Sequence, residues 1–100
     1  MDAEEYVEAV LAIVERIPRG RVTSYGIIAE AIGTGGPRQV GAVMSQYGGP
    51  VPWWRVVRAD GSLPESHHDE ARQAYLEEAT PLRASGNVNM RQAVWFPDLD

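Results

Sequence analysis

Residues 33–47 read GTGGPRQVGAVMSQY, and this stretch decides which kind of fold the chain can adopt. The glycine-rich start, residues 33–36, is a tight connector, and Pro37 suits the first position of a helix, where no backbone N–H is needed. Gly41 lies inside that helix and costs about 1 kcal/mol relative to alanine unless close packing requires it. One apolar face recurs at helical spacing: Val40, Val43, Met44 and Tyr47. The stretch therefore predicts a turn followed by a helix from Pro37 to Tyr47.

A second short helix is predicted on the N-terminal side of this turn. Thr23 or Ser24 can cap it, and Gly33 ends it near Ile32. Its buried side chains are expected to be Ile28, Ala31 and Ile32. Two short helices joined by a glycine turn are typical of a helix-turn-helix, in which residues 37–47 would be the recognition helix.

The first seventeen residues predict another helix. Asp2 and Glu5 have the spacing of a capping box, and an acidic outer face accompanies an apolar one over residues 3–16. The apolar positions are Tyr6, Val10, Ile13, Val14 and Ile17. Pro18-Arg19-Gly20 then predicts a turn, and residues 21–23 a short extended link.

The remainder of the chain predicts a small β element and one more helix. Residues 53–58 are expected to form a buried strand that Asp60-Gly61 turns back. Ser66 is expected to cap a helix that ends near Glu78 and turns Ala71, Ala74 and Tyr75 inward. Residues 85–87 predict a turn, and residues 94–96 a strand. The predicted fold class is mostly α with a small β element, a single winged-helix-like helix-turn-helix domain over residues 1–100.

Composition excludes several classes of function. The chain has no cysteine, so disulfides and thiolate chemistry are excluded. Acidic residues stand near the N-terminus where a signal peptide would be basic, and the longest apolar run, residues 9–14, is six residues long, too short to span a membrane. We therefore expect a cytoplasmic monomer that uses no cofactor and does not associate with a membrane.

The charge is distributed unevenly along the chain. The net charge is −5, but residues 16–58 carry six arginines and one glutamate, Glu30, between two acidic ends. A local positive field matters more to a polyanion than the total charge, so the basic middle indicates a nucleic-acid partner. All nine cations are arginine, which a GC-rich genome would also explain.

Three segments taken together resemble the DNA-binding domain of the O6-alkylguanine-DNA alkyltransferases. They are residues 17–26 (IPRGRVTSYG), residues 37–41 (PRQVG) and residues 51–57 (VPWWRVV). In that family the third segment carries the cysteine that takes the alkyl group from a flipped-out guanine, and here Trp53 stands in its place. Tryptophan at this position is the mark of the alkyltransferase-like branch, which binds the lesion without repairing it. Indole has no accessible lone pair to act as the nucleophile.

The resemblance assigns roles to residues of the matching motifs. Tyr25 would push on the phosphate beside the target base and hydrogen-bond the flipped guanine, although a half-buried aromatic at a helix start is the alternative. Arg38 would fill the gap in the base stack, since a guanidinium is planar and stacks. Its alternative is a solvated arginine in the first helical turn, where cations are disfavoured.

The pocket would be formed by the third segment. Trp53 would line it, Pro52 would shape its entrance, and the backbone carbonyls of Trp53 and Val56 would face the guanine edge. Trp54 replaces a histidine of the family's catalytic relay, and both tryptophans can also be plain core. Ser45 falls where the family has an asparagine at the end of the recognition helix. Arg55 is expected to be structural, a buried cation that ties the strand to backbone or to an acid.

The expected partner is double-stranded DNA that contains O6-alkylguanine, with nucleotide excision repair proteins as further partners. A helix-turn-helix transcription regulator without lesion preference is the main alternative, and an enzyme with a different nucleophile is a second. Ser66, His67 and His68 are candidates for the pocket lip. The run His67-His68-Asp69 is not expected to bind a metal, because adjacent histidines diverge on a helix.

Overall fold

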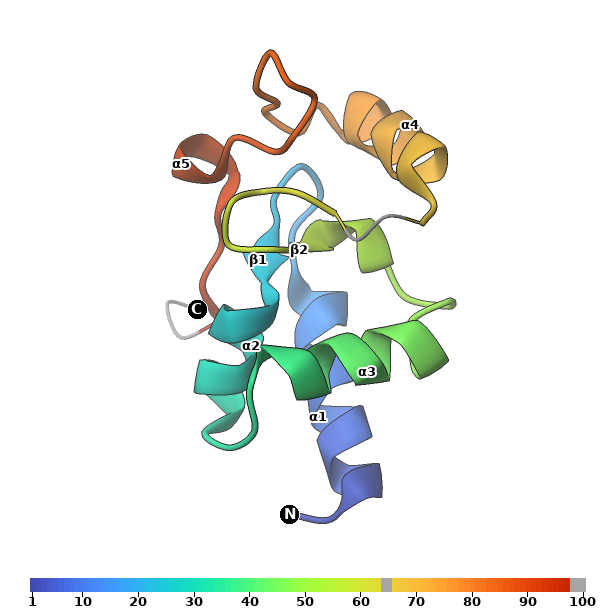
Figure 1. Cartoon of the computed structure of the whole chain (residues 1–100), viewed down its shortest axis with the longest axis vertical. Helices are drawn as coiled ribbons and strands as arrows, with labels where there is room; N and C mark the ends of the chain where they lie inside the picture. Colours follow the sequence, from blue (N-terminus) through green and yellow to red (C-terminus); the bar gives the residue numbers. More distant parts are fainter. Residues whose placement is uncertain (64–65, 98–100) are drawn as a thin grey trace.

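The computed structural model describes residues 1–63 and 66–97. The elements follow in the order α1 (Ala3–Arg16), β1 (Thr23–Ser24), α2 (Tyr25–Ile32), α3 (Pro37–Tyr47), the 3-10 turn η1 (Trp53–Arg55), β2 (Val56–Val57), α4 (His68–Glu78) and α5 (Met90–Ala93). Helices α1, α2 and α3 make up one end of the molecule, α4 and α5 lie at the other, and the short strands lie between them (Figure 1). None of the helices in the described ranges is long and apolar enough to cross a membrane.

Local chemistry sets the helix ends where the sequence predicted them. The Asp2 carboxylate accepts the N–H of Glu5 at 2.8 Å, and the Glu5 side chain accepts the N–H of Asp2, which completes the capping box of α1. Ser24 caps α2 by accepting the N–H of Ile27 at 3.1 Å. Gly33 ends α2 in the left-handed conformation with a φ of 89°, and Pro37 is the first residue of α3. The predicted helix-turn-helix is confirmed.

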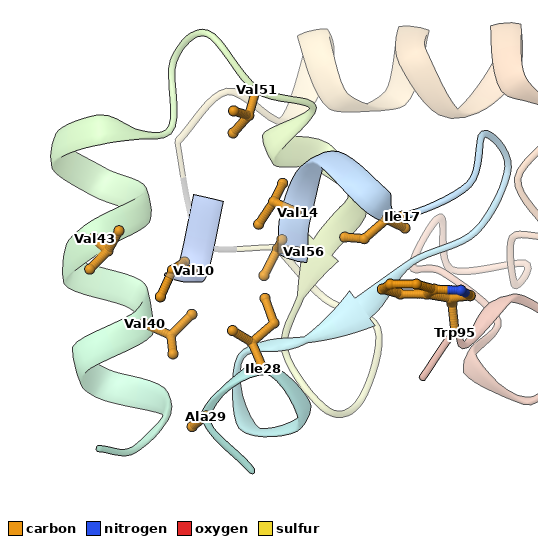
Figure 2. Close-up of a cluster of buried hydrophobic side chains, with 10 residues drawn as sticks. All are labelled: Val10, Val14, Ile17, Ile28, Ala29, Val40, Val43, Val51, Val56 and Trp95. Atoms are coloured by element: carbon orange, nitrogen blue, oxygen red, sulfur yellow. The ribbon is translucent and has the colours of Figure 1, made fainter. Parts of the chain in front are cut away.

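The three N-terminal helices enclose the larger of two apolar clusters. Its fully buried members point toward one another from α1, α2, α3 and β2 (Figure 2). The cluster consists of Val10, Val14, Ile17, Ile28, Ala29, Val40, Val43, Val51, Val56 and Trp95. Two expectations were wrong in detail: Ala29 is buried in α2 while Ala31 is only partly so, and Tyr47 of α3 remains 48% exposed.

The strand predicted for residues 53–58 is shorter than expected, and its pairing is different. Residues 53–55 form a 3-10 turn, and only Val56 and Val57 pair, in parallel, with Thr23 and Ser24. A parallel pair of strands needs a long crossover connection, and α2 and α3 supply it. The predicted hairpin would instead have paired residues 53–58 with a strand directly after the Asp60-Gly61 turn. The turn at Asp60-Gly61 is confirmed: Gly61 has a φ of 88°, and a Cβ there would collide with the Val88 carbonyl.

A second, smaller cluster lies on the other side of the strand pair. It consists of Val22, Val57, Ala71, Tyr75, Val88 and Ala93. Because neighbouring side chains of a strand point to opposite faces, Val56 belongs to the first cluster and Val57 to the second. The strand pair therefore joins the helix-turn-helix to the C-terminal half.

The C-terminal half differs from the prediction at three points. Helix α4 ends at Glu78 as expected, but His67, with a φ of 63°, precedes it in place of the expected Ser66 cap. The strand predicted for residues 94–96 is reduced to one parallel bridge between Val22 and Val94. The short helix α5 precedes it and was not predicted. These segments pair through tertiary contacts that a local pattern does not encode.

Candidate nucleic-acid interface

One cleft, with a volume of about 1050 Å³, runs between the exposed side of α3 and the start of α4. Four residues predicted to bind DNA or the lesion line it, and they come from three separate elements: Tyr25, Arg38, Ser45 and Trp53. Tyr25 and Trp53, which are 28 positions apart in the sequence, thus line the same cleft. Ligand pockets in proteins typically measure roughly 300–1,000 Å³, so this open cleft is large enough for a nucleobase with a substituent.

Tyr25 is the first residue of α2, directly after the Ser24 cap. Its ring packs partly against the first cluster, which agrees with the alternative of a half-buried aromatic, and partly lines the cleft. Burial raises the pKa of its phenol above the usual value of 10, although the nearby Arg58 guanidinium opposes this shift. The hydroxyl therefore stays protonated at neutral pH and can donate a hydrogen bond.

Arg38 is the second residue of α3 and is exposed on the rim of the cleft. A cation is disfavoured at a helix N-terminus, so helix stability does not account for it. No hydrogen bond or ion pair joins its guanidinium to another residue within the described ranges. The side chain is thus available to a ligand.

Trp53 is half-buried in η1, and its ring forms part of the cleft lining. It lies edge-on against Trp54, with ring centroids 5.6 Å apart and an interplanar angle of 83°. An indole offers a flat stacking surface and one N–H donor but no nucleophile. Because the chain contains no cysteine, the cleft holds no thiol that could accept an alkyl group.

Three other predicted residues are not part of the cleft lining. Pro52 precedes η1 and is half-buried, and the Val56 side chain is fully buried in the first cluster. The N–H of Val56 donates to the Trp53 carbonyl, which leaves that oxygen one lone pair for another donor. Trp54 packs against the second cluster instead, which agrees with its alternative as core.

Trp54 belongs to a hydrogen-bonded network centred on Glu78. Its indole N–H donates to Glu78 at 2.9 Å, and Arg55 donates to the same carboxylate at 3.0 and 2.7 Å. Arg55 also donates to the Ile17 carbonyl at 2.9 Å, so its predicted structural role is confirmed. Burial raises the pKa of the Glu78 carboxyl, but hydrogen bonds from Arg55, the Gly20 backbone and Trp54 outweigh it and lower that pKa below the usual 4.5.

The sequence did not point to several residues that line the cleft. Gly41 faces open space, since a Cβ there would meet nothing within 4 Å. Packing within the chain therefore does not require this glycine. Because Gly41 has no side chain, the backbone of α3 is exposed at this edge of the cleft. Arg58 belongs to the basic middle of the sequence, a signal that could have indicated it. The other lining residues outside the predicted set include Pro37, Met44, Leu63 and Glu70.

The sequence indicates Ser66, His67 and His68 as candidates for the pocket lip. Ser66 and His67 do line the cleft, whereas His68 does not. Among the residues that the structure describes, no three histidine, aspartate or glutamate side chains lie close enough together to hold a metal ion.

Comparison with known proteins agrees with this geometry. Residues 5–80 match the model of the family described as 6-O-methylguanine DNA methyltransferase, DNA binding domain. A DNA base-flipping protein of Vibrio parahaemolyticus is 30% identical over 99 residues, which cover 94% of this chain and 99% of the relative. A DNA base-flipping protein of Escherichia coli is 34% identical over 97 residues, which cover 92% of this chain and 75% of the relative.

A solved structure shows the same fold. S. pombe Atl1, in complex with damaged DNA containing O6-carboxymethylguanine, superposes with a TM-score of 0.83 at 26% identity. The superposition covers 95% of this chain and 98% of Atl1. The family match spans residues 5–80, and the two relatives align with 94% and 92% of this chain. The chain therefore belongs to the 6-O-methylguanine DNA methyltransferase family of DNA-binding domains, in its alkyltransferase-like branch.

Proposed function

We infer that this chain binds duplex DNA containing O6-alkylguanine, rotates the altered base out of the helix and holds it without removing the alkyl group. The observation that carries this inference is the cleft itself. It combines Arg38, which has no hydrogen-bond or ion-pair partner among the described residues, and a protonated tyrosine, Tyr25, with Trp53 where the family's acceptor cysteine would be. The names of the relatives, DNA base-flipping proteins, support the same function.

Docking would use the exposed side of α3. Gly41 has no side chain on that side of the helix, so the backbone of α3 can approach a DNA groove closely. Exposed arginines among residues 16–58, such as Arg58 on the cleft lining, would supply the phosphate contacts, which carry most of the sequence-independent affinity for DNA, whereas Arg55 is already bound by Glu78. This part of the binding does not distinguish a damaged duplex from an intact one.

Lesion preference would arise when the base leaves the stack. Unstacking costs a few kcal/mol, and the cost is lowest for a base that is already poorly paired. Arg38 would occupy the space the base leaves, while the base itself would enter the cleft beside Tyr25 and Trp53. Stacking on an aromatic side chain returns about 1–3 kcal/mol per base, which offsets the cost of flipping.

Chemistry would end at this bound state. Alkyl transfer from O6 needs an ionisable, soft nucleophile, and an indole cannot serve as one. The bound complex would then be the product, a stable mark on the lesion. We propose that nucleotide excision repair proteins are the partners that recognise this mark.

The decisive experiment compares one oligonucleotide duplex with and without a single O6-methylguanine. We expect tighter binding to the lesion duplex and no gain of mass by the protein after incubation with it. Equal affinity for the two duplexes would instead support a helix-turn-helix regulator. A protein that gains the mass of a methyl group would be an enzyme with another nucleophile.

A further inference from the structure

Two residues at the start of α4 add a carboxylate and an imidazole to the cleft lining. His67 and Glu70 both line it, and they are joined by a contact of 3.1 Å between the His67 Nδ1 and a Glu70 carboxylate oxygen. The His67 ring lies 5.9 Å from the Trp53 ring, between centroids, at an angle of 60°. The pair therefore stands beside the indole against which an alkylated base would lie.

The backbone at His67 supports a role in the cleft. Its φ of 63° is in the left-handed region, which a non-glycine residue adopts only at an energetic cost. Its side chain does not cap α4, so capping does not offset that cost. Strained residues of this kind concentrate at binding sites, where the surrounding structure holds them in place.

The contact with Glu70 also determines what His67 can offer. In the tautomer whose Nδ1–H donates to Glu70, Nε2 remains an acceptor. Both side chains then present acceptors, and Glu70 adds a negative charge. Glu70 is the only acidic residue among the described residues that line the cleft.

Resting on the function proposed above, we propose that His67 and Glu70 select the O6 substituent by its charge. Substituents that are neutral or carry a hydrogen-bond donor are accepted, and those that end in a carboxylate are disfavoured. A carboxylate beside Glu70 brings two like charges together, and such an arrangement weakens binding. The Glu70 side chain is 70% exposed in the free chain, so water and salt screen part of this repulsion. A donor in the same place meets acceptors on both residues.

Two cations of the cleft oppose this effect, and they lie elsewhere on its lining. Arg38 belongs to the start of α3, where the proposed function places it in the base stack. Arg58 follows β2, influences the Tyr25 phenol and donates to the Leu63 carbonyl at 3.4 Å. Neither forms an ion pair with Glu70 in the described residues. Of the described charged residues that line the cleft, Glu70 is the one in direct contact with His67, at 3.1 Å.

The test uses lesions that differ only in charge. Duplexes carry O6-carboxymethylguanine or its neutral isostere O6-carbamoylmethylguanine, and O6-methylguanine and unmodified guanine serve as references. We expect the wild-type chain to bind the carbamoylmethyl duplex about tenfold more tightly than the carboxymethyl duplex. Equal affinities would overturn the proposal.

Variants then assign the discrimination to its residues. Glu70→Gln should reduce the difference to about twofold or less, because it removes the charge and keeps the shape. Glu77→Gln is the matched control, since Glu77 is an exposed acid of the same helix outside the cleft lining. It should keep the full difference. A difference that persists in Glu70→Gln, or that Glu77→Gln removes equally, would show that Glu70 is not responsible.

A further variant tests whether His67 positions Glu70. Asparagine tolerates the left-handed conformation, so His67→Asn removes the imidazole without demanding a new backbone. We expect it to weaken the discrimination while the preference for O6-methylguanine over guanine remains. Full discrimination in this variant would exclude the positioning role of His67. The methyl and unmodified duplexes separate the two ideas: if they bind equally, the proposed function fails, and if only the charged and neutral isosteres bind equally, only this inference fails.

Discussion

The indole N–H of Trp54 donates a 2.9 Å hydrogen bond to the carboxylate of Glu78, 24 residues further along the chain. The backbone carbonyl of Trp54 accepts a second bond, at 2.7 Å, from the Tyr75 hydroxyl. Both partners belong to α4, so Trp54 is held to that helix at two points. Trp53, the residue before Trp54, lines the cleft. The two hydrogen bonds of Trp54 therefore hold η1 in place where it forms the wall of the cleft.

This bond should contribute measurably to stability. Trp54→Phe keeps most of the apolar ring and removes the N–H, and hydrogen bonds to charged groups are worth about 1.5–3 kcal/mol. We expect a decrease of that order in the free energy of unfolding, measured by urea denaturation. A double-mutant cycle with Glu78→Gln is the control, because the cost of Trp54→Phe should shrink when the charged acceptor is gone. Independent, additive effects would argue against the bond.

The same carboxylate predicts how stability depends on pH. The folded-state pKa of Glu78 lies below its usual value of 4.5, so its stabilisation is fully present above that value. It is lost as the pH falls through the lower, folded-state pKa. Unfolding measured in urea from about pH 6 to about pH 3 should show this loss in the wild-type chain and a smaller one in Glu78→Gln. Parallel curves for the two proteins would contradict the assignment.

Replacing Trp53 alone should not create an alkyltransferase. Trp53→Cys supplies a thiol, but Trp54 offers no base to deprotonate it, and the Glu78 carboxylate is already bound by Arg55. Mass spectrometry after incubation with O6-methylguanine DNA should find no methylated protein. The double variant Trp53→Cys with Trp54→His is the comparison, and methylation in the double variant alone would identify the imidazole as the missing group.

Tyr25 should contribute to lesion binding through its hydroxyl. Tyr25→Phe keeps the ring that packs against the first cluster and should leave the melting temperature nearly unchanged. Loss of one neutral hydrogen bond should weaken binding to O6-methylguanine DNA by about threefold to tenfold. Tyr25→Ala is a poorer test, because the buried part of the ring makes it lower stability as well. Unchanged lesion affinity in Tyr25→Phe would leave Tyr25 with a packing role only.

Arg38 should act as a plug in the base stack rather than as a simple phosphate contact. Arg38→Ala removes both the planar group and the charge, whereas Arg38→Lys restores the charge alone. Lys should therefore recover only a small part of the lost lesion affinity, and a fluorescent base analogue beside the lesion should report less flipping in both variants.

Binding of these proteins across a salt series distinguishes the alternative. A phosphate contact would be replaced almost fully by lysine, and Arg38→Ala would lower the salt slope by about one unit without changing lesion preference. Near-complete recovery by lysine would end the plug hypothesis.

The sequence by itself determined the helix-turn-helix and the absence of a thiol nucleophile. The Asp2–Glu5 capping box, Ser24, Gly33 and Pro37 set helix ends through contacts within a few residues, and such contacts depend only on neighbours in the chain. Trp53 in the VPWWRVV segment, with no cysteine anywhere, likewise needs no coordinates to exclude thiol chemistry.

Only the tertiary structure decided how the third segment is used. The aromatic and β-branched run at residues 53–58 predicted one strand, but packing against α4 forms a 3-10 turn at its start and β1 pairs with just two of its residues. Trp54 donates to Glu78 and is not part of the cleft lining. His67 and Glu70 line the cleft together with Trp53. These partners are separated by 14 to 24 positions or belong to different elements, and no local pattern encodes which of them will meet. Burial decided it, because the Trp54 N–H and the Arg55 guanidinium each needed an acceptor in the interior, and Glu78 was the carboxylate that the packing of α4 placed within reach.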